Sequence, residues 1–311
     1  MCKQSSPTTL TSVYFVACFA SHKHLLHVKS SLYISTKGET NGKRHTHTHT
    51  QTQQDLSQQT HKIHNGELSS RSQQESASDN RLLDISKNLL PQYGGNWSVH
   101  NLVTLKRMAL SRVIYYYELY QKIIDVPGVI CEFGVQWGAT LALLQNLRGM
   151  YEPYNHSRKI YGFDTFEGFS TIDSKDGGLP KVGDYKSLPS YENTLEEILS
   201  IHESFSPISH IKKYELLKGD ASQTIDTWLE KNPHAIVSMA IFDMDVYKPT
   251  KDVLEKIIPR LTKGSLLVFD ELSCQHFPGE TTAVQEVMGV NNLTLKRHPH
   301  QSYCAWAVYG E

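Results

Sequence analysis

The sequence predicts an α/β fold in which helices cover both faces of a mostly parallel, seven-stranded sheet. Short apolar runs alternate with helical patterns through the second half of the chain, and this alternation is typical of consecutive βαβ units. Gly134 and Gly138 follow the first of these runs, as expected where a strand turns into a helix beside a ligand. Acidic residues follow several later runs, which indicates a site at one edge of the sheet.

Residues 1–88 are expected to form a disordered tail, and residues 89–311 a single folded domain. The tail carries alternating His and Thr from position 45, followed by stretches rich in Gln and Ser. It holds too few apolar groups to offset the entropy that ordering would cost. Metal binding by the histidines is an alternative, but a simple repeat in the underlying codons explains the alternation without it.

The elements of the domain follow from its periodicity. Apolar residues recur at helical spacing from 102 to 124 and stop just before Pro127, which predicts an amphipathic helix. Strands are then expected at 129–135, 159–163, 214–217, 237–242, 264–269, 294–297 and 302–309. Helices are expected between them at 140–147, 195–202, 222–231, 250–261 and 281–288. The last two strands have only a short connection, so they should pair as an antiparallel hairpin.

Composition excludes several classes of protein. A formal net charge of −1 offers no basic surface for nucleic acid, and the chain lacks an apolar run long enough for a transmembrane helix. Five scattered cysteines without metal-binding spacing favour reduced thiols in a cytoplasmic protein. The alternative is a secreted protein, because the apolar stretch at 13–20 follows Lys3 and resembles a weak signal-peptide core.

The segment around Glu132, Gly134 and Gly138 predicts a cofactor site at the end of the first strand. Glycine allows the backbone to approach a ligand closely. The spacing is not GxGxxG, and the acidic Glu132 would repel a pyrophosphate. An acid here suits a cofactor that carries a sulfonium or ammonium group and no phosphate. A tight turn without any ligand is the alternative.

Two further strands end in groups that suit a nucleoside. Asp164 lies about 30 residues after Gly134, where a carboxylate accepts hydrogen bonds from ribose hydroxyls. Asp220 and Ser222 follow the next strand and are expected to contact the edge of an adenine. Asp220 could also serve as a helix N-cap, and the two roles are compatible.

Acidic residues also follow the next two parallel strands. Asp243 and Asp245 follow one of them, and Asp270 and Glu271 follow the other. Carboxylates that converge at one sheet edge repel each other unless a hard cation lies between them, and Mg²⁺ prefers oxygen ligands. The alternative is that these acids are helix caps and solvated loop residues. His276 is the histidine closest to this group in sequence.

Several of these segments, in order, resemble the macrocin O-methyltransferase family, and in particular its branch of nucleotide-deoxysugar 3-O-methyltransferases. The resemblance covers roughly residues 93–310 and depends on residues 131–140, 152–169, 243–247, 269–272 and 277–281. It implies a class I S-adenosylmethionine-dependent methyltransferase fold of Rossmann-like type. It also implies S-adenosyl-L-methionine as the methyl donor, Mg²⁺ as the metal and a sugar hydroxyl as the acceptor, and it leaves a homo-oligomer open.

The resemblance assigns the metal ligands to Asp243, Asp270 and Glu271, and the catalytic general base to Asp243. The 27-residue separation between Asp243 and Asp270 fits the family and favours Asp243 over Asp245. Glu271 departs from the pattern, because the family has two aspartates or an Asp-Asn-like pair here and glutamate is one methylene longer. The helix at 102–124 and the segment 167–191 are expected to form a lid over the acceptor.

Three other functions remain open at this point. The acceptor could be another small-molecule hydroxyl, because metal-dependent methylation of catechol-like compounds uses the same carboxylates. A nicotinamide-dependent oxidoreductase shares the sheet, but Glu132 argues against its pyrophosphate. A binding module without catalytic activity is the third alternative, and the acids at 243, 270 and 271 argue against it.

Overall fold

The computed structural model describes residues 62–64, 67–69 and 72–311. The predicted signal-like stretch at 13–20 and the His-Thr alternation lie outside these residues. In the described part of the chain, no helix is long and apolar enough to cross a membrane. The cysteines in that part (Cys131, Cys274 and Cys304) are buried and form no disulfide.

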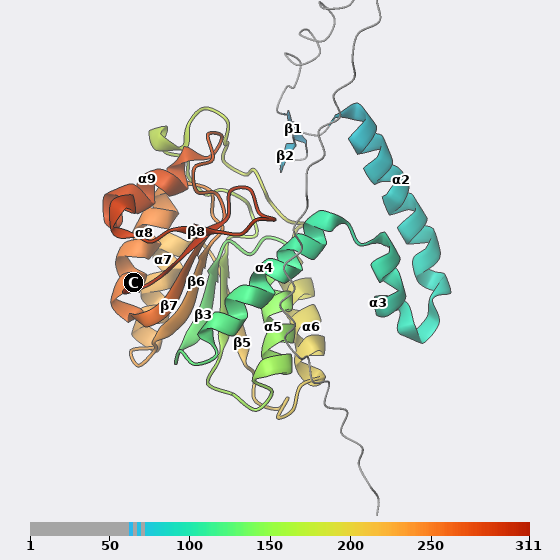
Figure 1. Ribbon diagram of the computed structural model, residues 1–311, viewed down its shortest axis with the longest axis horizontal. Helices are drawn as coiled ribbons and strands as arrows, with labels where there is room; N and C mark the ends of the chain where they lie inside the picture. The colour runs from blue at the N-terminus through green and yellow to red at the C-terminus, as the bar shows by residue number, and fades with distance from the viewer. Residues whose placement is uncertain (1–61, 65–66, 70–71) are drawn as a thin grey trace, which may run out of the picture. The chain divides into compact units, whose positions relative to one another are not determined.

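The domain is built on one seven-stranded sheet with the order β5-β4-β3-β6-β7-β9-β8 (Figure 1). Five strands run parallel: β3 (Val129–Phe133), β4 (Ile160–Asp164), β5 (Tyr214–Lys218), β6 (Val237–Phe242) and β7 (Leu261–Phe269). The last two, β8 (Lys296–Arg297) and β9 (Ala305–Val308), are antiparallel to each other, and β9 is antiparallel to β7. This arrangement confirms the predicted fold class and its C-terminal hairpin.

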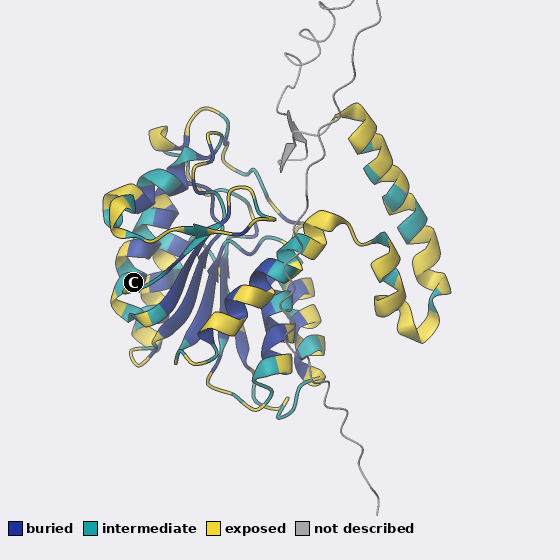
Figure 2. Ribbon diagram, in the orientation of Figure 1, coloured by how far each residue is buried: buried dark blue, intermediate teal, exposed yellow. Residues whose placement is uncertain are grey.

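Helices cover both faces of the sheet, which is buried between them (Figure 2). One face packs against α4 (Arg107–Ile123), α5 (Ala139–Tyr151) and α6 (Tyr191–Ser204), and the other against α7 (Ala221–Lys231), α8 (Tyr247–Ile257) and α9 (Pro278–Val287). Consecutive residues of a strand point to opposite faces of the sheet: Ile130 packs in the core formed with α4 to α6, and Cys131 in the core formed with α7 to α9. Strands buried on both faces explain the continuous apolar runs in the sequence.

The chain ahead of the sheet contains short elements. An antiparallel pair, β1 (Lys62–His64) and β2 (Glu67–Ser69), is followed by helix α2 (Gln73–Leu89). Short helices follow it: η1 (Leu90–Gln92), η2 (Gly94–Asn96), α3 (Trp97–His100) and η3 (Asn101–Thr104). Helix α2 buries no residue, and the side chains of Ser86 and Asn101 hydrogen-bond it to η3.

Helix α2 differs from the expectation that residues 1–88 carry no ordered structure. It begins with a capping box, in which Ser72 accepts from the backbone of Glu75 while Glu75 accepts from the backbone of Ser72. The capping box lies inside a Ser- and Gln-rich stretch. The composition of that stretch favours disorder, and the prediction followed the composition. Residues 1–61 of the expected tail are outside the described part, so the boundary at residue 88 stays a prediction.

Several predicted helix bounds differ from the structure: α5 continues to Tyr151, α6 begins at Tyr191, and two further differences have a local cause. The helix expected from residue 102 begins at Arg107, because residues 101–104 form η3 instead. The helix expected to reach residue 261 ends at Ile257, since Pro259 lacks a backbone N–H and ends it in the short η5 (Ile258–Arg260). Leu261 then starts β7. The remaining short helices are η4 (Ser174–Asp176) and η6 (Val290–Asn292).

Candidate functional site

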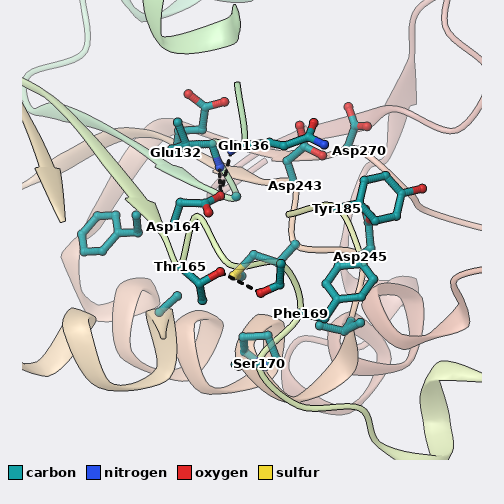
Figure 3. Close-up of a pocket in the computed structure, with 18 of the residues that line it drawn as sticks. Glu132, Gln136, Asp164, Thr165, Phe169, Ser170, Tyr185, Asp243, Asp245 and Asp270 are labelled. Carbon is teal, nitrogen blue, oxygen red and sulfur yellow. Dashed lines mark hydrogen bonds between the residues drawn. The ribbon is translucent and has the colours of Figure 1, made fainter. Parts of the chain in front are cut away.

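A cavity of about 430 Å³ opens at the carboxyl ends of β3, β4, β6 and β7 (Figure 3). This is where open α/β sheets bind ligands. Among the described residues that line it, seven are acidic and Arg112 alone is basic. The acids are Glu132, Asp164, Asp220, Asp243, Asp245, Asp270 and Glu271. Such a lining favours a ligand that carries a positive charge.

The two glycines of the first turn are required for different reasons. Gly134 lines the cavity at φ +94°, and a Cβ there would lie 1.8 Å from the backbone oxygen of Asp243. Gly134 is therefore needed for the close approach of the chain after β3 to the chain after β6. Gly138 does not line the cavity; it caps α5 in the left-handed conformation, and a Cβ would collide with Leu195. The structure shows Gly138 packed against α6, and its expected contact with a cofactor stays a prediction.

Glu132, on β3, is 1% exposed and faces the cavity. Its Oε2 atom has no hydrogen-bond partner among the described residues. Burial and the neighbouring Asp243 raise the pKa of this carboxyl well above its ordinary value. A buried polar atom without a partner is costly, so Glu132 is suited to a positively charged or hydrogen-bond-donating ligand.

Asp164 ends β4 and faces the first turn. Its Oδ2 atom accepts hydrogen bonds from the backbone N–H groups of Val135 at 2.6 Å and Gln136 at 2.8 Å (Figure 3). Its Oδ1 atom accepts from the backbone of Phe166. Asp164 lines the cavity as expected, but it also fixes the turn, which the sequence did not predict. A carboxylate has about four acceptor positions, so one remains for a ligand.

Asp220 is the N-cap of α7 and also lines the cavity. Its Oδ1 atom accepts from the backbone of Ser222 at 2.8 Å, and its Oδ2 atom accepts from the hydroxyl of Ser170 at 2.7 Å. The structure therefore confirms that Asp220 caps a helix, and the residue still lies on the cavity wall, where a ligand contact is compatible with the cap. Ser222 is not among the lining residues.

Asp243 and Asp270 follow β6 and β7 and meet across the guanidinium of Arg112. Arg112 Nη2 lies 3.0 Å from Asp243 Oδ2, and Nη1 lies 3.7 Å from Asp270 Oδ1. Burial and the charge of Asp270 raise the pKa of Asp243 to about 7, although Arg112 lowers it. Burial raises the pKa of Glu271 to about 7 as well. Mutual repulsion and burial thus make these carboxylates hard to ionise together.

Asp245 does not cap the following helix, which corrects one alternative for this residue. The N-cap of α8 is Val246, whose apolar side chain makes no capping hydrogen bond. Asp176, from η4, instead accepts a hydrogen bond from the backbone of Tyr247. Asp245 lines the cavity with a left-handed backbone (φ 61°), and burial raises its pKa.

The site contains residues that sequence reasoning missed. Arg112 and Thr140 come from α4 and α5, and Arg112 donates to Thr140 Oγ1 through two nitrogens. Glu280, fully buried, accepts a hydrogen bond from the backbone of Glu271 at 3.0 Å. The rings of Phe169 and Tyr185 line the cavity and lie 5.3 Å apart. Thr140, Phe169 and Glu280 lie within the segments that carry the family resemblance, but no local motif marks Arg112 or Tyr185. His276, singled out by its position in sequence, is not among the lining residues.

The predicted metal ligands fit a divalent cation in charge and donor type. Asp243, Asp270 and Glu271 all line the cavity, and Glu271 Oε2 is buried without a hydrogen-bond partner in the described structure. In this arrangement, however, no three His, Cys, Asp or Glu side chains of residues 72–311 converge closely enough to hold a metal ion. Arg112 occupies the position between the first two carboxylates.

Comparison with known proteins gives consistent matches. Residues 25–299 match the family described as macrocin-O-methyltransferase (TylF). The crystal structure of CalS11, a calicheamicin methyltransferase, is 37% identical, with a TM-score of 0.74, and the match covers 78% of this chain and 95% of that one. The apo structure of CalS11, described as TDP-rhamnose 3′-O-methyltransferase, is 36% identical, with a TM-score of 0.68, and the match covers 78% of this chain and 97% of that one.

A curated relative from Streptomyces olivaceus is 26% identical over 193 residues. It is described as 8-demethyl-8-(2,3-dimethoxy-alpha-L-rhamnosyl)-tetracenomycin-C 4′-O-methyltransferase. The match covers 57% of this chain and 65% of that relative, so it spans less than two thirds of the relative's length.

Proposed function

Because the chain belongs to the macrocin-O-methyltransferase (TylF) family, we propose that it transfers a methyl group from S-adenosyl-L-methionine to a sugar hydroxyl. The observation that carries this proposal is the unpartnered, buried Glu132 in an acid-lined cavity beyond the glycine turn. A sulfonium-bearing donor without phosphate suits that lining. A dinucleotide would place its pyrophosphate near the end of β3, against Glu132.

We assign the methyl donor to the part of the cavity formed by β3, β4 and the start of α7. Glu132 would bind the charged methionine portion, and the remaining acceptor position of Asp164 would bind a ribose hydroxyl. Asp220 would accept a hydrogen bond from the adenine amino group while it continues to cap α7. When bound, S-adenosylmethionine supplies an electrophilic methyl group on a positively charged sulfur.

The acceptor would lie toward Asp243, Asp270 and the aromatic pair Phe169 and Tyr185. Aromatic rings with nearby carboxylates suit a sugar, which offers apolar C–H faces and hydroxyl donors. The names of the relatives favour a rhamnose-type sugar, linked to a nucleotide or to a natural product. Helix α4 and the segment 167–191 would cover it, since both contribute residues to the cavity.

Methyl transfer requires the acceptor oxygen to lie in line with the donor methyl group and to lose its proton. We propose that Asp243 accepts this proton, because it follows β6 on the acceptor side of the cavity and a carboxylate can act as a general base. Asp243, Asp270 and Glu271 would hold Mg²⁺, which lowers the pKa of a hydroxyl that it binds. Glu280 would fix the backbone of Glu271 through its hydrogen bond at 3.0 Å.

The test is methyl transfer by the full-length chain. Labelled S-adenosylmethionine is incubated with a panel of nucleotide-linked sugars, in Mg²⁺ or in EDTA, and products are detected by mass spectrometry. EDTA and Asp270→Ala should each lower transfer at least about 100-fold, since both remove the proposed metal. Asp226→Ala is the matched control, because Asp226 is an exposed acid on α7 outside the cavity. Transfer that is indifferent to EDTA and to Asp270→Ala would refute the metal, and absence of donor binding would refute the methyltransferase.

A further inference from the structure

Arg112 is a cation built into the acid-lined cavity. It lies on α4, and its guanidinium reaches Thr140 on α5, Asp243 after β6 and Asp270 after β7. The contact with Asp243 is a hydrogen bond of 3.0 Å, and Nη1 lies 3.7 Å from Asp270. One positive group therefore interacts with two of the three carboxylates that we assign to the metal.

A guanidinium and a divalent cation cannot share these oxygen atoms without strong repulsion. Like charges a few ångströms apart in a partly buried site repel each other, and the repulsion grows with the charge of the ion. A divalent ion beside Asp243 Oδ2 and Asp270 Oδ1 would face Arg112 at a comparable distance. The lining offers no other basic residue in the described part of the chain, so this competition concerns Arg112 alone.

Arg112 is also placed so that it can leave. Its side chain is 34% exposed, although it contacts two carboxylates. Residues 107–110 ahead of it on α4 are exposed, whereas Tyr115 and Tyr116 behind it are buried. The long, flexible stem of arginine can therefore move toward solvent while the buried half of α4 stays docked.

We propose that Arg112 determines how tightly the site binds a divalent cation, because it neutralises Asp243 and Asp270 until the metal displaces it. This inference rests on the metal-dependent part of the proposed function. It also accounts for the lack of a closed set of three ligands among residues 72–311: the carboxylates are arranged around a planar, monovalent cation.

Metal binding itself provides the test. Mn²⁺ is titrated into the full-length protein and followed by electron paramagnetic resonance, without donor or acceptor. Arg112→Met removes the charge and keeps an unbranched stem, and it should bind Mn²⁺ about tenfold more tightly, as expected when an ion pair worth about 1.4 kcal/mol is lost. Arg112→Lys keeps the positive charge but not the planar fork, so its Mn²⁺ affinity should lie between those of the wild type and of Arg112→Met. Asp270→Asn should lose binding in either background.

Arg112→Gln provides a second neutral variant if Arg112→Met does not fold, as judged by thermal melting. Equal or weaker Mn²⁺ binding by both neutral variants would overturn the inference. Binding by the neutral variants but not by the wild type would support it. Absence of Mn²⁺ binding in every variant would overturn both the competition and the metal site. S-adenosylmethionine binding and methyl transfer in EDTA, measured on the same samples, would then show whether the methyltransferase activity still stands.

Discussion

The Oδ2 atom of Asp164 accepts a hydrogen bond from the backbone N–H of Val135 at 2.6 Å, so the end of β4 holds the turn that follows β3. The same atom accepts from Gln136, whose backbone is left-handed (φ 48°). One carboxylate thus stabilises a turn conformation that is unfavourable for a residue other than glycine. The turn and the proposed ribose-binding position therefore depend on the same carboxylate.

Asp164→Asn should therefore impair both stability and donor binding. The amide cannot accept from three backbone N–H groups as a carboxylate does, so we expect a loss of about 2 kcal/mol in the free energy of unfolding. Donor affinity should fall about tenfold or more. Urea denaturation and calorimetric titration measure the two effects. Glu167→Gln is the control, because Glu167 is 81% exposed and lies three residues after Asp164; equal effects of the two variants would contradict the assignment.

Gly134→Ala should be among the most destabilising single substitutions in the chain. Its Cβ would lie 1.8 Å from a backbone oxygen, so the chain after β3 or β6 must move, at a cost of about 4 kcal/mol or more. Gly183→Ala has a similar backbone (φ +84°) but open space around the Cβ, and should cost about 1 kcal/mol. Chemical denaturation of both proteins separates collision from backbone strain. Similar losses in the free energy of unfolding for the two variants would mean that a small backbone shift relieves the collision at Gly134.

Asp220 can be divided into its two roles by the choice of substitution. Asp220→Ala removes the cap of α7 and should lower stability by about 1 kcal/mol, whereas Asp220→Ser keeps a capping oxygen and should stay near the wild type. Both should weaken S-adenosylmethionine binding by about tenfold, since the carboxylate is lost in each. Melting curves and donor titrations give the two readouts. Unchanged donor affinity in Asp220→Ser would leave Asp220 as a cap only.

The ligand-free protein should lose stability as pH rises from about 4 to 7. Burial, with the charge of Asp270, raises the pKa of Asp243 to about 7, and burial raises that of Glu271 to about 7. These groups ionise near pH 4 in an unfolded chain. Because these pKa values are higher in the folded state, the stabilisation is complete only below the unfolded value near 4 and is lost as pH rises through the folded value of about 7.

Asp243→Asn should flatten this dependence, by an amount on the order of 2 kcal/mol between pH 4 and 7. The measurement is the free energy of unfolding in urea as a function of pH, in EDTA. Glu286→Gln serves as the control, because the exposed Glu286 pairs with Lys175 and Lys251 and its pKa is lowered, to about 2. Wild-type and Asp243→Asn curves that run parallel would contradict the raised pKa.

The sheet could be predicted from sequence because its signals are local. Each parallel strand is a short apolar run, and the short connection before β9 required an antiparallel pair. The acids at 164, 220, 243, 270 and 271 could be placed at one cavity because parallel strands end at the same edge. These predictions required only the order of the elements along the chain. They did not depend on knowing any side-chain contact.

The rest depended on contacts that no local pattern records. Arg112 meets Asp243 across 131 positions of sequence, and its place on an amphipathic helix looks like that of any solvated arginine. The sequence predicts a ligand contact for Gly138. It cannot show that a Cβ at this position would collide with Leu195, because that contact depends on how α6 packs. Helix α2 was missed because the composition of its surroundings outweighed the capping box at Ser72.

The 131-position separation of Arg112 and Asp243 has a consequence for the order of events on the ribosome. Helix α4 is synthesised early, yet the buried tyrosines Tyr115 and Tyr116 pack in a core that includes Leu266 and Val268 of β7. The packing of the nascent helix therefore stays incomplete until more than a hundred further residues, including β7, have been added. We expect this interval to be the period in which the emerging chain most needs chaperone protection.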